Sequence, residues 1–200
     1  MLRLYDYLAS GNGYKVRLLL HQLGLPFERV ELDILKGETR TPAFLARNPN
    51  GRIPTLELED GTYLPESNAI LWYLAEGTPF LPEERIARAQ VLAWMCFEQY
   101  SHEPNIATLR FWTHAGLLEQ RAALVPGKRE AGVAALGVME GHLATRSFFV
   151  AERYTIADIA LYAYTHVAEE GGFSLAAYPA IRAWLACVAG QPAHIPITEG

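Results

Sequence analysis

The pattern of hydrophobic and polar positions in the first third of the chain predicts a β-α-β unit. Two short extended runs, 2–7 and 27–34, flank the segment 14–24, in which hydrophobic residues recur at helical spacing. These residues are Val16, Leu19, Leu20 and Leu23. The predicted helix therefore presents one hydrophobic face to a sheet. Gly24 follows it, at a position where glycine commonly ends a helix.

A loop and a short helix follow the second predicted strand. Thr41 can cap this helix, and Pro42 would then occupy its first position, where proline is favoured. The next two extended runs lie on either side of Asp60-Gly61, a dipeptide that supplies the positive backbone angles of a tight hairpin. A helix over 67–77, with Ser67 as its cap, completes the order β-α-β-α-β-β-α.

The hydrophobic pattern changes after residue 77. Residues 78–84 contain two prolines and no periodic pattern, which is typical of a linker. Helix-spaced segments then cover 85–115, 127–145, 155–169 and 178–190. We therefore expect a mixed α/β domain over 1–77, the linker 78–84 and an all-helical domain over 85–200.

The third of these helical segments begins with a capping box. Thr155 lies three residues before Asp158, so each side chain can accept a hydrogen bond from the other residue's backbone N–H. The helix that follows is hydrophobic on almost every face. We expect it to be the buried central helix of the second domain.

Composition narrows the class of protein. The net charge of −5 argues against general nucleic-acid binding, which depends on an excess of Lys and Arg. The longest hydrophobic runs are far too short to cross a bilayer, and the first residues lack the hydrophobic segment of a signal peptide. We expect a soluble cytoplasmic protein with no membrane partner. Cys96 and Cys187 lack the spacing of a redox or zinc motif, so we expect both in the core.

Several chemistries lack support in the sequence. Gly11 and Gly13 follow a predicted strand and Asp33 lies about twenty residues on, as in a dinucleotide-binding fingerprint. However, Val16 stands where that fingerprint has its third glycine, and the predicted sheet is too small for a doubly wound fold. The six histidines show no metal-ligand spacing and no G-x-S-x-G motif occurs, so we expect neither a metal site nor a serine hydrolase.

Four motifs in register then point to a family. "SGNGYK", "NPNGRIPTLELEDG", "LPESNAILWYLAE" and "YTIADIALYAY" occur in that order along the predicted elements. With them, the chain resembles the cytosolic glutathione S-transferases, in particular their bacterial branches, over essentially all of its 200 residues. The resemblance implies a thioredoxin-like first domain, an all-helical second domain, glutathione as co-substrate and a homodimer.

The resemblance also implies where the glutathione sulfur would lie. The family holds this sulfur as a thiolate with a residue at the end of the first strand or the start of the first helix, and Ser10 and Asn12 match those positions. A hydroxyl, an amide and the positive end of a helix all favour an anion, and the thiolate is the reactive form of a thiol. Tyr5 and Tyr7 remain alternatives at this point.

The rest of the tripeptide would bind to three further segments, again by resemblance. Ile53-Pro54 matches the cis-proline of the family, which leaves the backbone of Ile53 free to bind the cysteinyl backbone. Glu66 and Ser67 match the residues that bind the γ-glutamyl end. The glycyl carboxylate needs a cation or donor, and the candidates are Arg52 and Thr39, with Lys36 and Arg40 as competitors.

The electrophile would bind between the domains, against the first helix of the second domain. That segment is unusually polar and aromatic, and a kink at Pro104 would open it. The candidate residues are Tyr100, His102, Asn105, Arg110 and Trp112.

These residues imply an enzyme that adds glutathione to a small hydrophobic electrophile, or that uses it to reduce a peroxide or a disulfide. The alternative is a non-catalytic glutathione-binding or protein-interaction module with the same fold. The first domain contains no cysteine, which argues against a reductase that uses its own thiol.

Overall fold

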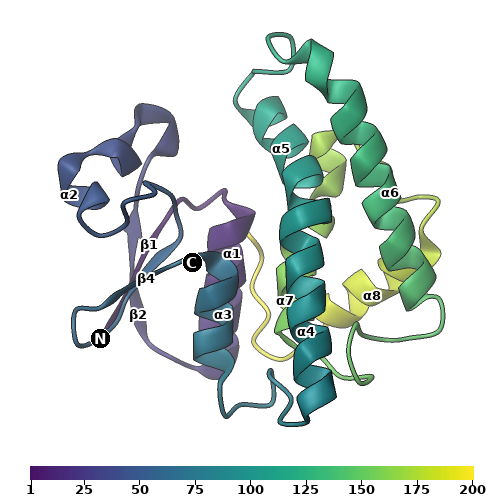
Figure 1. The fold of residues 1–200 in the computed structure, drawn as a ribbon, viewed down its shortest axis with the longest axis horizontal. Helices are drawn as coiled ribbons and strands as arrows, with labels where there is room; N and C mark the ends of the chain where they lie inside the picture. Colours follow the sequence, from purple (N-terminus) through teal and green to yellow (C-terminus); the bar gives the residue numbers. More distant parts are fainter. The chain divides into compact units, whose positions relative to one another are not determined.

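The computed structural model describes all 200 residues, and they form two compact units. The first unit comprises Met1–Glu76 together with Pro192–Gly200, and the second comprises Gly77–Gln191. The return of the last segment to the first unit differs from the expected second domain over 85–200. Figure 1 follows the chain by colour, and the yellow end of the chain lies in the unit that carries the purple start.

The first unit is built on a mixed four-stranded sheet with the order β2-β1-β3-β4. The strands are β1 (Leu2–Asp6), β2 (Phe27–Glu31), β3 (Thr55–Glu57) and β4 (Tyr63–Pro65). β1 runs parallel to β2 and antiparallel to β3, which pairs with β4 across a tight turn. Gly61 in this turn has a φ of 84°, so the predicted hairpin is confirmed.

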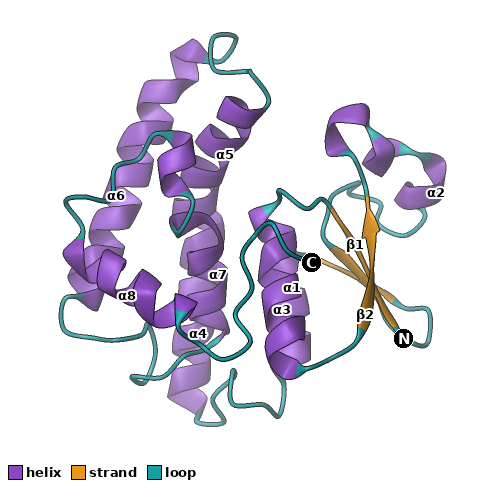
Figure 2. Cartoon of the chain, turned by 180° about the vertical axis from the view of Figure 1, so that it is seen from behind, coloured by secondary structure: helices purple, strands orange, loops and turns teal.

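Helices cover both faces of this sheet. α1 (Gly11–Leu23) and α3 (Ser67–Ala75) lie together on one side, and α2 (Pro42–Leu45) lies on the other (Figures 1 and 2). Successive side chains of a strand point to opposite faces, so Leu4 contributes to the core beneath α1 and α3 while the ring of Tyr5 meets Phe44 of α2. The core beneath α1 and α3 is formed by Leu4, Val16, Leu20, Leu56 and Ile70. This arrangement has the predicted order of elements, and it is the thioredoxin-like fold that the resemblance implied.

Most local signals in the first unit are confirmed. Gly24 ends α1 with a φ of 65°, and the Thr41 hydroxyl accepts a hydrogen bond from the backbone of Phe44 at 3.3 Å. The segment between β2 and α2 adds two short 3₁₀ helices, η1 (Ile34–Lys36) and η2 (Glu38–Arg40). The prediction of Ser67 as a helix cap is wrong: Glu66 is the N-cap of α3, and the helix ends at Ala75.

The second unit is all-helical, as expected. Its helices are α4 (Arg85–Phe97), α5 (Glu103–His114), α6 (Val125–Leu143), α7 (Ile156–Thr165) and α8 (Pro179–Ala189), with short turns η4 (Ala122–Leu124) and η5 (Ala168–Gly171). A π-helical turn, η3 (Glu98–His102), joins α4 to α5. Pro104 follows this turn and lacks an N–H, so the wider π turn lies where an α-helical hydrogen bond could not form.

α7 is the central helix of this unit, and all its residues are buried. The predicted capping box is present: the Thr155 hydroxyl accepts from the N–H of Asp158, and the Asp158 carboxylate accepts from the N–H of Thr155 at 2.9 Å. Asp158 also accepts from the backbone of Phe149 and from the indole of Trp184. One carboxylate therefore joins the start of α7 to a loop and to α8.

The expectation that both cysteines lie in the core is wrong, since Cys96 and Cys187 are exposed. In α4, the buried residues are Ala87, Val91 and Met95, so Cys96 falls one position beyond the buried stripe. Cys187 lies one position before the buried Val188 in α8 and is likewise outside the buried stripe. No helix in the chain combines the length and the hydrophobicity that a bilayer crossing requires.

Candidate functional site

Ser10 opens α1 as its N-cap. Its backbone is extended (φ −75°, ψ 124°), and its hydroxyl accepts a hydrogen bond from the N–H of Gly13 at 3.3 Å. The first turn of α1 carries no acidic residue, so nothing within that turn offsets the positive end of the helix dipole. Ser10 and Asn12 are half-buried at this end of the helix. The start of α1 can therefore receive an anion.

A close approach between β1 and α1 requires a glycine at position 13. A Cβ atom at this position would lie 1.6 Å from Oδ1 of Asp6, the last residue of β1. Asp6 is fully buried and forms an ion pair with Arg17. Burial raises the pKa of the Asp6 carboxyl to about 6, although Arg17 lowers it. The first turn of α1 thus rests directly on a buried carboxyl group.

The side chain of Asn12 links the starts of two helices. Its Oδ1 atom accepts hydrogen bonds from Nζ of Lys15 at 2.8 Å and from the hydroxyl of Ser67 at 3.3 Å. Lys15 also donates to the Ser67 hydroxyl at 3.4 Å. Ser67 is the first residue of α3, so this cluster joins the N-termini of α1 and α3. It brings together the segment that the resemblance assigns to the glutathione sulfur and the segment that it assigns to the γ-glutamyl end.

Glu66 precedes Ser67 with an unusual backbone conformation. Its φ is 70°, in the region that favours glycine, and non-glycine residues in this region often mark functional sites. The Glu66 side chain is exposed and forms no ion pair or hydrogen bond within the chain. Ser67 behind it is 5% exposed. A charged ligand could therefore meet a free carboxylate beside a helix N-terminus.

The peptide bond between Ile53 and Pro54 is cis, as the resemblance implied. No backbone hydrogen bond within the chain involves Ile53. The loop around it is held through Arg52, whose carbonyl oxygen accepts from the amide of Asn48 at 2.8 Å and from the hydroxyl of Thr55 at 3.3 Å. The backbone of Ile53 can thus pair with an extended peptide.

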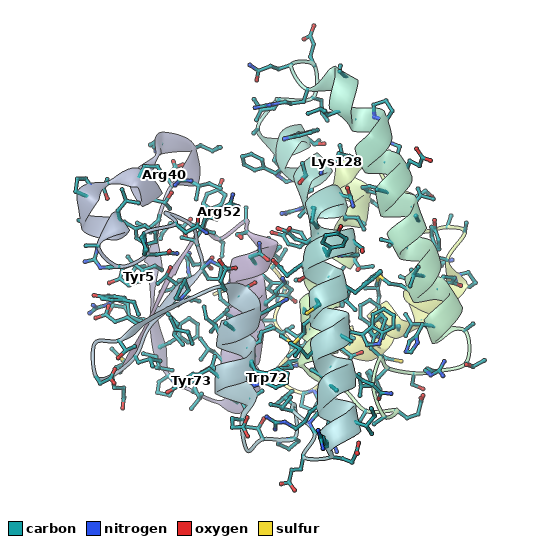
Figure 3. The ribbon with its side chains drawn as sticks, in the orientation of Figure 1. Tyr5, Arg40, Arg52, Trp72, Tyr73 and Lys128 are labelled. Atoms are coloured by element: carbon teal, nitrogen blue, oxygen red, sulfur yellow. The ribbon has the colours of Figure 1, made fainter.

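Three cations near this loop differ in their availability. Lys36 forms an ion pair with Asp33 at 2.9 Å, and Arg40 donates to the carbonyl oxygen of Asn50 at 2.9 Å. The exposed side chain of Arg52 has no such partner. In Figure 3, Arg40 and Arg52 lie toward the same end of the first unit. Thr39, 5% exposed, offers little surface to a ligand.

Tyr5 lies on the sheet face opposite α1. Its hydroxyl donates to Glu57 at 2.8 Å, and burial raises the pKa of that hydroxyl. Tyr5 is therefore a poor candidate for the site at the start of α1. Its side chain lies on the other face of the sheet, and its hydroxyl proton is already donated to Glu57. Tyr7 is half-buried near Ser10, whose N–H donates to the carbonyl oxygen of Tyr7.

The residues expected to bind an electrophile lie in η3 and α5 of the second unit. Tyr100 is 89% exposed and Trp112 is half-buried. His102, Asn105 and Arg110 are buried, and each has a hydrogen bond within this unit: to Thr165 at 2.9 Å, to the carbonyl oxygen of Ser101 at 2.7 Å and to Glu170 at 2.6 Å. Their role toward an electrophile stays a prediction.

Sequence reasoning missed the charged residues beneath the first turn of α1. Lys15 and Arg17 are fully buried. The signal for Lys15 was present, because it lies four residues before Leu19 and therefore on the hydrophobic face of the helix. A charged residue in that position indicates a buried partner.

Comparison with known proteins identifies the family. Family models for the glutathione S-transferase N-terminal domain and C-terminal domain match residues 9–76 and 87–192. The crystal structure of a glutathione S-transferase from Pseudomonas fluorescens is 54% identical and covers 99% of both chains, with a TM-score of 0.97. The chain belongs to the glutathione S-transferase superfamily, in the bacterial branch that its motifs indicated.

Two further relatives extend the range of the similarity. Glutathione S-transferase 3 from Zea mays is 34% identical over 203 residues, which cover 96% of this chain and 90% of that protein. A solved structure of Ure2p in complex with glutathione is 27% identical and covers 96% of this chain and 95% of the other, with a TM-score of 0.88.

Proposed function

We propose that this chain is a glutathione transferase that binds glutathione to its first unit and holds the sulfur as a thiolate at Ser10 and Asn12. The contact between Asn12 and Ser67 carries the proposal, because it joins the N-termini of two helices at one point. Two positive helix ends and several donors at one point favour an anion. The solved complex of Ure2p with glutathione supports the same ligand.

The tripeptide would extend from this point in two directions. Ser67 and the first N–H groups of α3 suit the γ-glutamyl carboxylate, and the free carboxylate of Glu66 suits the ammonium. The unpaired backbone of Ile53 suits the cysteinyl backbone. For the glycyl carboxylate, the partner-free Arg52 is a better candidate than Lys36 or Arg40, with Thr39 beside it.

Activation then depends on the protonation state of the sulfur. A free thiol has a pKa near ~8.5, so only a small part of it is thiolate at neutral pH. Donors that bind only the anion lower this pKa, and a shift of about 2 units corresponds to roughly 2.7 kcal/mol of preferential binding. The thiolate would attack the electrophile directly. In a peroxide or disulfide reduction, it would be oxidised to a mixed or glutathione disulfide.

Two variants of Asn12 test this assignment. Asn12→Ala removes the amide donors, and we expect kcat with a chlorodinitrobenzene-type electrophile to fall about 10- to 100-fold while glutathione affinity changes less. Asn12→Asp places a carboxylate beside the sulfur and should raise the thiol pKa further. Calorimetry measures the affinity, and pH profiles of kcat report the thiol.

Each outcome separates the candidate functions. A wild-type protein that does not bind glutathione would contradict the proposal. Tight binding without turnover of an electrophile, a peroxide or a disulfide would favour the non-catalytic module. Unchanged kinetics in both Asn12 variants would show that Asn12 has no catalytic role. Ser10 and Tyr7 would then be the remaining candidates for contact with the glutathione sulfur. We also propose a homodimer, as is usual in the family, which light scattering after gel filtration can measure.

A further inference from the structure

Lys15 is a buried cation whose presence the proposed function leaves unexplained. It lies one helical turn after Asn12 in α1, so the two side chains share a helix face. None of its surface is exposed. Burying a lysine is costly unless its donors are satisfied, so its position beside the proposed thiolate site calls for a role.

The hydrogen bonds of Lys15 determine how the Asn12 amide is oriented. A lysine ammonium can only donate, so the atom that faces it at 2.8 Å must be the amide oxygen of Asn12. The Ser67 hydroxyl donates to the same oxygen at 3.3 Å and accepts from Lys15 at 3.4 Å. A rotated amide would set its NH₂ group against the Lys15 ammonium, which cannot accept a hydrogen bond. The oxygen is therefore fixed on the side of Lys15 and Ser67, and the NH₂ group is directed away from them.

We propose that Lys15 is a positioning residue that turns Asn12 into a donor for the glutathione sulfur. This inference rests on the proposed function, because it needs the sulfur at Asn12. A freely rotating amide would present its oxygen to the thiolate part of the time, and that contact is repulsive. A donor on the amide oxygen also polarises the amide and strengthens its N–H groups.

The same cation connects the proposed sulfur position with the proposed γ-glutamyl position of the glutathione site. Lys15 contacts the Ser67 hydroxyl, which we assigned to the γ-glutamyl carboxylate, as well as the Asn12 amide. Removing the cation should therefore affect binding modestly, through Ser67, and thiol activation strongly, through Asn12. A split between affinity and kcat distinguishes this role from general support of the fold.

The test uses the full-length protein and the pKa of bound glutathione. Lys15→Met keeps the length of the side chain and removes its donors. We expect the thiol pKa, followed by the ultraviolet absorbance of the thiolate, to rise by about 1 unit, and kcat at neutral pH to fall about 10-fold or more. Lys15→Arg keeps the charge and donors and should restore part of both. Lys128→Met, which removes a half-buried lysine that donates to the carbonyl oxygen of Pro104 in the second unit, should leave the thiol pKa unchanged.

A double-mutant cycle tests whether Lys15 acts through Asn12. In an Asn12→Ala background, Lys15→Met should change the thiol pKa by less than about 0.5 unit and kcat by less than about 3-fold, because the amide it orients is gone. Losses that multiply would mean that Lys15 acts on the sulfur by itself, and this would overturn the proposal. An unchanged thiol pKa in the folded Lys15→Met variant would also overturn the proposal. If the Met variant does not fold, the same measurement on Lys15→Leu replaces it.

Failure of this inference is distinct from failure of the proposed function. If wild-type protein binds no glutathione, or if Asn12→Ala is fully active, the proposed function fails first. If Asn12→Ala lowers kcat and Lys15→Met does not, the function stands and only the positioning role is wrong.

Discussion

Gly13 occupies a position where any larger residue would meet a buried charge. The atom nearest to a Cβ built at this position is Oδ1 of Asp6, at 1.6 Å. Asp6 cannot easily move, because it is fully buried and paired with the equally buried Arg17. This glycine, which appeared in the sequence as part of an incomplete dinucleotide-binding fingerprint, is therefore required by space, and the group that it makes room for lies in the preceding strand.

We predict that Gly13→Ala destabilises the protein by at least about 2 kcal/mol, since forced overpacking in a core typically costs 1–3 kcal/mol. Gly137→Ala is the matched control. Gly137 is exposed in α6 with no atom within 4 Å of its built Cβ, so alanine there should be neutral or stabilising by up to about 1 kcal/mol. Urea denaturation measures both. Equal stability of the two variants would contradict the close approach.

Residue types alone predicted some of the site but could not predict burial. The resemblance placed Ser10 at the start of the first helix, and the structure has Ser10 as the N-cap of α1. Lys15 and Cys96 both depart from the burial that is usual for their residue types: the lysine is buried and the cysteine is exposed. A position one step around a helix reverses exposure, and single-residue tendencies do not resolve that step.

The N-terminus of α7 is stabilised by one carboxylate with four donors. Asp158 accepts from the N–H and the hydroxyl of Thr155, from the N–H of Phe149 and from the indole of Trp184. Burial nevertheless raises the pKa of this carboxyl to about 6, from 3.8 in its unperturbed state. The folded protein therefore binds a proton at Asp158 more tightly than the unfolded chain does.

The pH dependence of stability follows from this shift. Since the pKa is higher in the folded state, the contribution of Asp158 is fully present below pH 3.8 and is lost as the pH rises through about 6. The shift corresponds to an effect on the order of 3 kcal/mol. We predict that the stability advantage of wild type over Asp158→Asn, which cannot titrate, decreases as the pH rises from about 4 to about 7. Denaturation at a series of pH values measures it, and an advantage that grows with pH would contradict the assignment.

Elements defined by neighbouring residues were predictable, whereas those that depend on distant contacts were not. The Thr155–Asp158 capping box and the hairpin at Gly61 each rest on residues a few positions apart, and both are confirmed. The cap of α3 was assigned to Ser67 but is Glu66. Ser67 instead donates its hydroxyl to Asn12, 55 residues away, and that partner could not be read from the local sequence.

At the scale of the whole molecule, the chain ends in the unit where it begins. Residues 192–200 carry no periodic pattern, and the sequence therefore gave no sign of where they pack. They bind to α1 through their backbone: Arg17 donates to the carbonyl oxygens of Ile197 at 2.8 Å and Glu199 at 3.1 Å, and the Tyr14 hydroxyl donates to that of Ile195 at 2.7 Å. Any residue offers a carbonyl oxygen, so such docking leaves no signature in side-chain types.

Arg17 makes this docking relevant to the proposed active site. Besides the terminal segment, its guanidinium donates to the carbonyl oxygen of Leu8, in the loop that leads to Ser10, and pairs with Asp6 beneath Gly13. The terminal segment and the loop before α1 therefore share one buried side chain. Loosening the segment should expose polar groups of Arg17 and weaken the start of α1 as well.

We predict that Tyr14→Phe releases the terminal segment. The substitution keeps the buried ring and removes the hydroxyl that donates to Ile195 and also contacts Nε2 of His194, which should cost about 1–2 kcal/mol of stability. Tyr73→Phe, in α3 with 53% of its surface exposed, is the matched control and should change stability by less than about 0.5 kcal/mol. Hydrogen exchange should accelerate in 192–200 and in the first turn of α1 but not in α7, which belongs to the other unit. Unchanged exchange in 192–200 would mean that the Tyr14 hydroxyl does not hold this segment, and acceleration throughout the chain would mean that the two units open together.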